Sequence, residues 1–371
     1  MALWGKKIRK KNGTNEVIVC GLQGRFRVKN QKYILKDGSS TDYLQLCNGA
    51  GFEHYTAGLC RFIETWSNDL SYRRMSDLLL QVTGTKILTA SGVQSYLLRK
   101  GERISQEWVS QSRDTIKTIA VVPDIKVYDA QAPEVILLMD DVGVKAQKPH
   151  KNVKRVATDP KRLDTTVVLV EAADKKYHYA TSGIDKTGKT IYSIAQAIID
   201  KVSTLHDVSA PIPIVAVTDG ARSIRRTLES IFGQDVCIIL DWYHLQLKVK
   251  NLMSMIAHNK ADKELYIKDL KSFLWVGDVT QALAYLDAMD SVRNQAKHQE
   301  LRDYLAKHQK EIINYGVRQA ANKPIGSGRG EKANDSVVAH RQKKKGMAWS
   351  PIGSAALAII KTNRMNLHFA A

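Results

Sequence analysis

The sequence predicts an α/β protein built on a mixed β-sheet, with helical segments before and within the sheet region. Between residues 134 and 241 the pattern is strand, strand, strand, helix, strand, helix, strand. Residues 50–120 and 243–320 instead carry apolar residues at helical spacing. Apolar residues make up 44% of the 371 residues and charged residues 25%, which is typical of a folded globular protein.

Residues 1–50 are predicted to form a basic N-terminal arm and short strands, because residues 14–37 alternate and are rich in Val, Ile, Tyr and Phe. The first residues, MALWGKKIRKKNG, lack the apolar core and cleavage site of a signal peptide, so we expect a cytoplasmic protein. No long apolar segment predicts a membrane partner. None of the four cysteines forms a CxxC pair, so we expect buried thiols in a reducing compartment.

Residues 51–125 are predicted to form a helical DNA-binding domain. Ser71 is a candidate N-cap and Gly84 a candidate stop for one helix, and a short helix follows from residue 90 to near Gly101. Two such helices suggest a helix-turn-helix, although any helical hairpin has this pattern. The second helix would bury Val93, Tyr96 and Leu97. The candidate DNA contacts in this region are Arg73, Arg74, Ser91, Gln94 and Arg99.

Residues 130–245 are predicted to form the first part of a sheet domain. The expected strands are 134–145, 165–172, 176–182, 213–218 and 235–241, and the expected helices are 190–205 and 221–232. Three antiparallel strands followed by helix-linked parallel strands are the order of the ribonuclease H-like fold, although other α/β folds share it. Residues 246–320 would be a helical insertion, and residues 321–371 would add the C-terminal helices.

Three acidic residues suggest a metal site. Asp140 ends the apolar run VILLMD, Asp219 ends PIVAVTD, and Glu331 lies on a late predicted helix. Such carboxylates could hold two Mg²⁺ or Mn²⁺ ions for phosphodiester chemistry. Each acid also has a structural interpretation: Asp141 competes with Asp140, Asp219 could belong to an Asp-Gly turn, and Glu331 could face a helix dipole.

The motif Asp241-Trp242-Tyr243-His244 follows the last predicted strand. Asp and His three residues apart at a helix start lie on one side, so His244 could orient a phosphate or hydrogen-bond a metal-ligating acid. Trp242 could stack on an unpaired base or pack in the core. A zinc site is not supported, because no Cys or second His stands at zinc spacing.

The net charge of +19 and the sequence pI of about 9.6 favour a polyanionic partner, although a solubility surplus is the simpler alternative. Two basic segments would hold the DNA backbone. They contain Lys145, Lys148 and Lys151 in one case and Arg341, Lys343 and Lys344 in the other.

The segments MDDVGVKAQK, VTDGAR, LDWYH and IGSGRGE…VVAHRQKKKGMAWS resemble those of bacterial DDE transposases of the insertion-sequence ISKra type. These are related to the Mutator-like group with a C/D-x-x-H motif. The resemblance covers residues 60–371. It implies a ribonuclease H-like core with a helical insertion, catalytic acids at Asp140, Asp219 and Glu331, and the C/D-x-x-H residues at Asp241 and His244.

The function expected from these observations is a magnesium-dependent DNA transposase. It would bind the terminal inverted repeats and the target as double-stranded DNA, and act as a dimer or higher oligomer. Two alternatives stay open at this stage. One is a nuclease of the same fold that cuts without joining, and the other is a domesticated DNA-binding protein with an inactive site.

Overall fold

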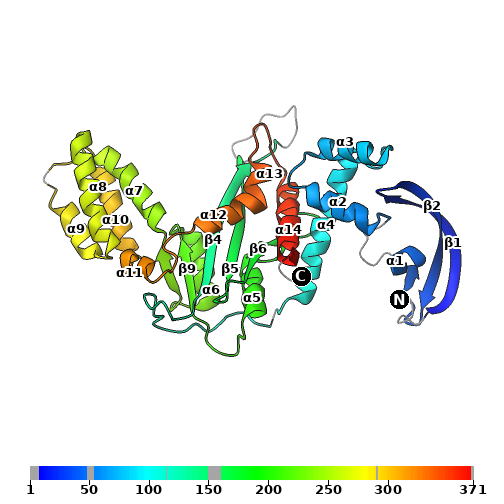
Figure 1. Ribbon diagram of the computed structural model, residues 1–371, viewed down its shortest axis with the longest axis horizontal. Coiled ribbons are helices and arrows are strands. Elements are labelled where there is room, and N and C mark those ends of the chain that lie inside the picture. Colours follow the sequence, from blue (N-terminus) through cyan, green and yellow to red (C-terminus); the bar gives the residue numbers. More distant parts are fainter. Residues whose placement is uncertain (1–7, 48–53, 114, 149–159, 290, 369–371) are drawn as a thin grey trace.

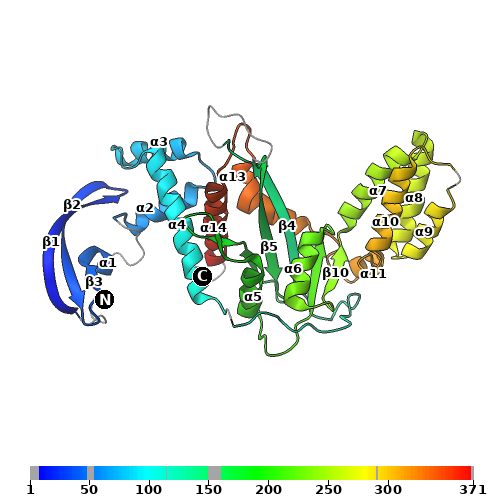
Figure 2. The same ribbon diagram turned by 180° about the vertical axis from the view of Figure 1, so that it is seen from behind.

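The computed structural model describes residues 8–47, 54–113, 115–148, 160–289 and 291–368. The chain forms an elongated molecule with three parts in a row (Figure 1). An N-terminal β-hairpin lies at one end, a sheet covered by helices lies in the middle, and a bundle of helices lies at the other end. The view from behind shows the same arrangement (Figure 2).

The N-terminal hairpin consists of β1 (Ile8–Gly21) and β2 (Gly24–Leu35), which are antiparallel, with β3 (Ser40–Asp42) on the other edge of β2. The short helix α1 (Tyr43–Cys47) follows. These strands are longer than the short ones expected, because β1 extends back into the exposed basic segment by pairing with the end of β2. The expectation of buried thiols is wrong for Cys47, which is exposed, while Cys20 and Cys60 are buried.

Three helices precede the sheet: α2 (Ala57–Trp66), α3 (Tyr72–Thr83) and α4 (Ala90–Gln111). The predicted ends of α3 are confirmed. Ser71 Oγ accepts a hydrogen bond from Arg74 N, and Gly84 adopts a left-handed conformation with φ of 68°. Val93, Tyr96 and Leu97 are buried, as predicted from the spacing of α4.

The prediction that the helix from residue 90 ends near Gly101 is wrong, because α4 continues to Gln111. Gly101 lies inside the helix, where it contacts the C-terminal helix α14 (Pro351–His368). A Cβ atom at this position would lie 2.8 Å from Ala356 Cβ and 2.9 Å from Ala356 Cα. The glycine therefore allows two helices to cross closely, which a local sequence pattern cannot distinguish from a helix stop.

The central sheet has five strands in the order β10-β9-β4-β5-β6. These are β4 (Val135–Lys145), β5 (Arg162–Glu171), β6 (Tyr177–Ala180), β9 (Ile214–Thr218) and β10 (Cys237–Leu240). β4, β5 and β6 pair antiparallel, while β9 and β10 run parallel to β4. The molecule is thus a mixed α/β protein, as predicted.

Helices cover both faces of this sheet. α5 (Ile194–Leu205) and α6 (Arg222–Phe232) bury apolar side chains against one face, together with Leu137 and Ala216 of the strands. α4 and the C-terminal helices lie over the other face, where Leu138 and Val217 are buried. The small strands β7 (Gly183–Ile184) and β8 (Thr190–Tyr192) pair beside α4.

The helices predicted for residues 243–320 are confirmed. They are α7 (Trp242–Ile256), α8 (Lys260–Trp275), α9 (Val279–Asp287), α10 (Gln295–Lys307) and α11 (Tyr315–Ala320). α7 to α10 form a bundle that projects from the β10 end of the sheet (Figure 2).

The chain then returns to the sheet through α12 (Gly328–Asn334), the π-helical turn η1 (Asp335–Ala339), α13 (His340–Gln342) and α14. α12 packs on β4 and β5, and α14 packs on α4, so the C-terminal segment covers the centre of the sheet. Among the described residues, no helix combines the length and apolar character needed to cross a membrane.

The close crossing at Gly101 leads to a prediction about stability. Gly101→Val should lower the free energy of unfolding by about 2 kcal/mol, because the added atoms meet the backbone of Ala356. Denaturant unfolding measures this change. Ser95→Val introduces the same side chain on the exposed side of α4 and should change stability by less than about 0.5 kcal/mol. Equal stability of the two variants would contradict the close-packing account.

Candidate metal centre at the edge of the sheet

Asp140 and Asp219 lie on neighbouring parallel strands. Leu138 of β4 is in register with Val217 of β9. Asp140 and Asp219 each lie two residues further along, so they are side by side and on the same face of the sheet. The predicted strand 134–145 is confirmed, since β4 continues past the apolar run to Lys145. Asp140 lies where β4 extends past the end of β9, so its carboxylate is at an edge.

The alternation of the strand places Asp140 and Asp141 on opposite faces of the sheet. Asp140 Oδ2 accepts a hydrogen bond from Asn334 Nδ2 at 2.6 Å, so this side chain faces α12. Asp141 Oδ1 accepts one from Thr166 Oγ1 at 2.5 Å, across the β4–β5 pair. Because neighbouring residues of a strand point to opposite faces, only Asp140 is on the face that carries α12.

Glu331 lies on α12, which approaches β4 very closely. A Cβ atom at Gly330 would lie 2.9 Å from Leu138 Cβ, two residues before Asp140. This contact sets the helix that bears Glu331 directly against the strand that bears Asp140. Asn334, one turn after Glu331, fixes the same junction through its bond to Asp140. The sequence reasoning missed Asn334, although a buried polar residue one turn after a candidate acid is a detectable signal.

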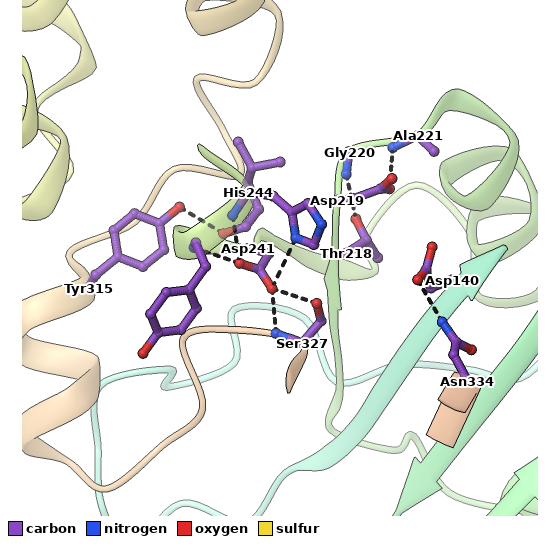
Figure 3. A network of polar contacts seen from close by, with 12 residues as sticks. Asp140, Thr218, Asp219, Gly220, Ala221, Asp241, His244, Tyr315, Ser327 and Asn334 are labelled. Atoms are coloured by element: carbon purple, nitrogen blue, oxygen red, sulfur yellow. Dashed lines mark hydrogen bonds and ion pairs between the residues drawn. The ribbon is translucent and has the colours of Figure 1, made fainter. Parts of the chain in front are cut away.

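Asp241 is a buried junction between three segments, as Figure 3 shows. Its Oδ1 caps α7 by accepting hydrogen bonds from Tyr243 N at 2.6 Å and His244 N at 3.0 Å. Its Oδ2 accepts bonds from both N and Oγ of Ser327 at 2.5 Å. Ser327 immediately precedes α12, and its carbonyl accepts a bond from Glu331 N. Asp241 therefore positions the helix with Glu331.

His244 lies between these elements. Its Nδ1 is 3.4 Å from Asp241 Oδ2, which confirms that the two residues share one side of the helix start. One ligand atom from each of Asp241, His244 and Glu331 lies within 4.8 Å of the others. Asp140 and Asp219 lie outside that tight group, and Figure 3 shows Asp219 beside the imidazole of His244. The structure thus brings His244 to the predicted acids, with Asp241 as its partner.

The pKa values show that these groups interact. The Asp241 carboxylate raises the pKa of His244 against the effect of burial, and Asp219 and Glu331 raise it further. Burial raises the pKa of Asp140, and the charge of Asp219 adds to this effect. Burial would also raise the pKa of Asp241, but hydrogen bonds from His244 and Ser327 outweigh it and lower the pKa to about 2.

Trp242 packs in the core. It is 7% exposed, and its ring centroid lies 4.9 Å from those of Trp275 and Tyr315. Of the two interpretations offered by the sequence, the structure supports packing. The aromatic cluster holds the start of α7 against α11, whose Tyr315 Oη donates to Leu240 O at 2.8 Å.

A buried His308–Glu311 pair, which the sequence reasoning also missed, supports the Asp219 turn. His308 Nδ1 lies 2.5 Å from Glu311 Oε2, and Glu311 also pairs with Arg225. A Cβ atom at Gly220 would lie 2.7 Å from His308 Cε1, and Gly220 has φ of 83°. Asp219 Oδ1 accepts a hydrogen bond from Ala221 N at 2.8 Å. The turn is therefore stabilised by a hydrogen bond within it and by its contact with His308.

The predicted DNA contacts occupy varied environments. Arg73, Arg74, Ser91, Gln94, Lys145, Lys148, Lys343 and Lys344 are exposed, and Arg99 is half-buried. Arg341 is buried, whereas a residue on a basic surface run would be exposed. Lys151 lies outside the described residues. No known protein family matches any part of this chain, and no curated protein is significantly similar to it.

The low pKa of Asp241 leads to a prediction with a defined pH dependence. Asp241→Asn should lower the free energy of unfolding by about 2 kcal/mol at neutral pH, because a pKa lowered from 3.8 to about 2 favours the folded state by that amount. A group whose pKa is lowered on folding stabilises above its unfolded pKa. The difference between the two proteins should therefore be constant above about pH 4 and shrink as the pH falls toward 2.

Denaturant unfolding at a series of pH values measures this difference. Asp77→Asn, at an exposed position on α3, is the matched control and should leave stability unchanged. A difference between Asp241→Asn and the unsubstituted protein that stays constant down to pH 2 would be inconsistent with an ionised Asp241 as the source.

Proposed function

We propose that this protein is a metal-dependent DNA transposase of the DDE type, which cuts strands at the ends of a mobile element and joins them to a target. The observation that carries the proposal is the grouping of Glu331, His244 and Asp241 at the sheet edge, where Asp140 lies on β4 and Asp219 follows the adjacent strand β9. These residues are far apart in the sequence. Their carboxylates repel each other, which disfavours this arrangement unless a cation binds.

The topology of the sheet supports a ribonuclease H-like core. Numbered within the core, β4, β5, β6, β9 and β10 become strands 1 to 5, and the order across the sheet is 5-4-1-2-3. Strands 1 to 3 are antiparallel, and strands 4 and 5 run parallel to strand 1. The sequence predicts, for that fold, this succession of three antiparallel strands followed by helix-linked parallel strands. The acids on strand 1, after strand 4 and on a helix near the C-terminus suit the DDE arrangement.

The donor set fits divalent cations such as Mg²⁺ or Mn²⁺. Asp140, Asp219 and Glu331 offer carboxylate oxygens, which these ions prefer, and no lysine or arginine nitrogen in the described part of the chain lies within 4.0 Å of them. A pair of such ions, when bound, would activate the attacking oxygen and stabilise the leaving oxygen. Two ions need a wider set of ligands than one, which agrees with acids spread along an edge.

The residues of the chain then have distinct roles. Asp140, Asp219 and Glu331 would hold the ions, and Asn334 would fix the carboxylate of Asp140. The neighbouring carboxylates raise the pKa of His244, and its protonated form could donate to a phosphate oxygen. Each oxygen of Asp241 already accepts two hydrogen bonds, so Asp241 would position His244 and α12 without contacting substrate.

The charge of the chain supports DNA as the substrate. A net charge of +19 attracts polyanions over long range, and exposed basic residues on α3 and in the segment after α13 offer phosphate contacts. The acids of the metal site are a local exception within this basic chain. That contrast suits an enzyme that holds DNA by its backbone and cleaves it with metal ions.

The opposite faces of Asp140 and Asp141 provide a sharp test. Asp140→Asn and Asp219→Asn should each reduce magnesium-dependent strand cleavage by at least about a hundredfold, because each removes a metal-ligating charge. Asp141→Asn should keep cleavage within a few fold of the unsubstituted rate, because Asp141 bonds Thr166 on the other face. All three proteins should bind DNA with similar affinity. Cleavage by Asp219→Asn at the unsubstituted rate would refute the assignment.

Two further measurements separate this function from its alternatives. Pre-cut DNA ends and a supercoiled target report strand transfer, so cleavage without joining would favour a nuclease. Calorimetric titration with manganese reports metal binding directly. An absence of binding to the folded protein would favour a DNA-binding protein with an inactive site.

A further inference from the structure

A polar cavity lies between α3, the end of β4 and the start of α14, away from the acids. Its volume is about 400 Å³. Three of the predicted DNA contacts, which come from distant parts of the chain, line it together: Arg73, Gln94 and Arg341. The loop before α14 reaches the end of β4 through hydrogen bonds from Trp349 N to Lys145 O and from Gln147 N to Trp349 O. We call this cavity the Arg341 pocket.

Two helices begin at the Arg341 pocket. Ser71 caps α3, and Ser350 Oγ accepts a bond from Gly353 N at the start of α14; both serines line the pocket. Each cap satisfies one backbone N–H of its helix. The other N–H groups of a first turn have no partner within the helix, and the helix dipole adds partial positive charge there. Two helix starts, of 12 and 18 residues, thus favour an anion in one cavity.

Arg341 adds a full positive charge to this place. It is 3% exposed and lies beside two aromatic rings that contact each other, with its guanidinium 4.8 Å from the Trp349 ring centroid and 5.9 Å from that of Tyr72. Its Nε is buried without a hydrogen-bond partner among the described residues. Arginine keeps its charge when buried, so a buried guanidinium normally pairs with an acid.

No carboxylate in the described part of the chain lies within 4.0 Å of the guanidinium of Arg341. The carboxylate of Asp69 interacts with it only at longer range and pairs instead with His340, at 3.2 Å. The aromatic rings stabilise the cation in part, but they supply no acceptor for Nε. Nη1 of Arg341 donates to the weak acceptor Met347 Sδ, and an anion in the pocket would supply the acceptor that Nε lacks among the described residues.

We propose that the Arg341 pocket binds a phosphate group of the DNA backbone and anchors the duplex beside the catalytic site. The proposal rests on the function proposed above for its choice of DNA as the source of the phosphate. The surroundings favour a chain of phosphates over a single ion, because Arg73, Arg74, Lys343 and Lys344 extend the positive charge over the exposed surface around the pocket.

The position along β4 agrees with this anchoring role. Lys145, whose carbonyl binds Trp349, lies five residues beyond Asp140 on the same strand. At about 3.3 Å per residue this is roughly 17 Å, or about five base pairs of duplex. A duplex whose scissile phosphate lies near Asp140 would therefore reach the pocket within half a helical turn.

The test measures affinity for a short random-sequence duplex in EDTA, so that no cleavage is required. Arg341→Met should weaken binding about tenfold, because hydrogen bonds between a charged donor and phosphate have about this effect. It should also make the slope of log affinity against log salt shallower by about 0.9, the value for one lost phosphate contact. Lys268→Met, at an exposed position of α8 in the distant helical bundle, is the matched control and should have a smaller effect on affinity.

A second measurement does not involve DNA. Inorganic phosphate should raise the melting temperature of the unsubstituted protein more than sodium chloride does at equal ionic strength, and should raise that of Arg341→Met less. Should Arg341→Met fail to fold, Arg73→Met on the other side of the pocket replaces it in both measurements, because Arg73 is exposed and its loss leaves the core intact.

The outcomes are distinguishable. Equal duplex affinity of Arg341→Met and Lys268→Met would overturn the proposal. If phosphate still stabilised the protein through Arg341, the pocket would bind free phosphate instead. Loss of duplex affinity in Arg341→Met, in a protein that never cleaves DNA with magnesium, would support the pocket while refuting the proposed catalysis. If the protein cleaves DNA normally and Arg341→Met binds duplex with unchanged affinity, the proposed catalysis is supported and the pocket is refuted.

Discussion

The candidate site depends on one buried carboxylate that accepts hydrogen bonds from two segments. Asp241 follows the last strand, caps the first helix of the insertion and accepts hydrogen bonds from Ser327 where the chain returns. The insertion is also attached at this point by bonds from Leu240 N to Glu311 O and from Trp242 N to Ile325 O. A long excursion of the chain can therefore leave and rejoin the sheet without displacing the helix that carries Glu331.

Close approaches at glycine complete the same arrangement. Gly330 brings α12 onto Leu138, and Gly220 lets His308 of the insertion contact the turn after Asp219. Each contact fixes one acid relative to the strands. The acids are thus held by backbone geometry and by single hydrogen bonds, and a carboxylate oxygen that accepts one hydrogen bond keeps a second lone pair for a cation.

The parts of this structure that follow from local patterns were predictable from the sequence, and those that depend on distant neighbours were not. The caps Ser71 and Gly84, the strand runs and the buried face of α4 are local, because they are set by hydrogen bonds or alternation within a few residues. The continuation of α4 through Gly101 depends on Ala356. The placement of Asp140 at an edge of the sheet depends on where the neighbouring strand β9 ends. The burial of Arg341 depends on two aromatic rings from other segments.

The two polar sites have opposite and complementary charges. Around Asp140, acids gather without a basic partner within 4.0 Å in the described chain, while at the Arg341 pocket a buried cation and two helix starts gather without an acid. The charge of Asp219 disfavours ionisation of the partly buried Asp140, and Arg341 is a buried cation without an acid partner in the described chain, so each arrangement disfavours the free protein. A metal-bound DNA duplex would relieve both at once, because it brings cations to the acids and phosphates to the arginine. Binding of metal and DNA should therefore be mutually reinforcing, which is what an enzyme needs if it is to cut only when substrate is held.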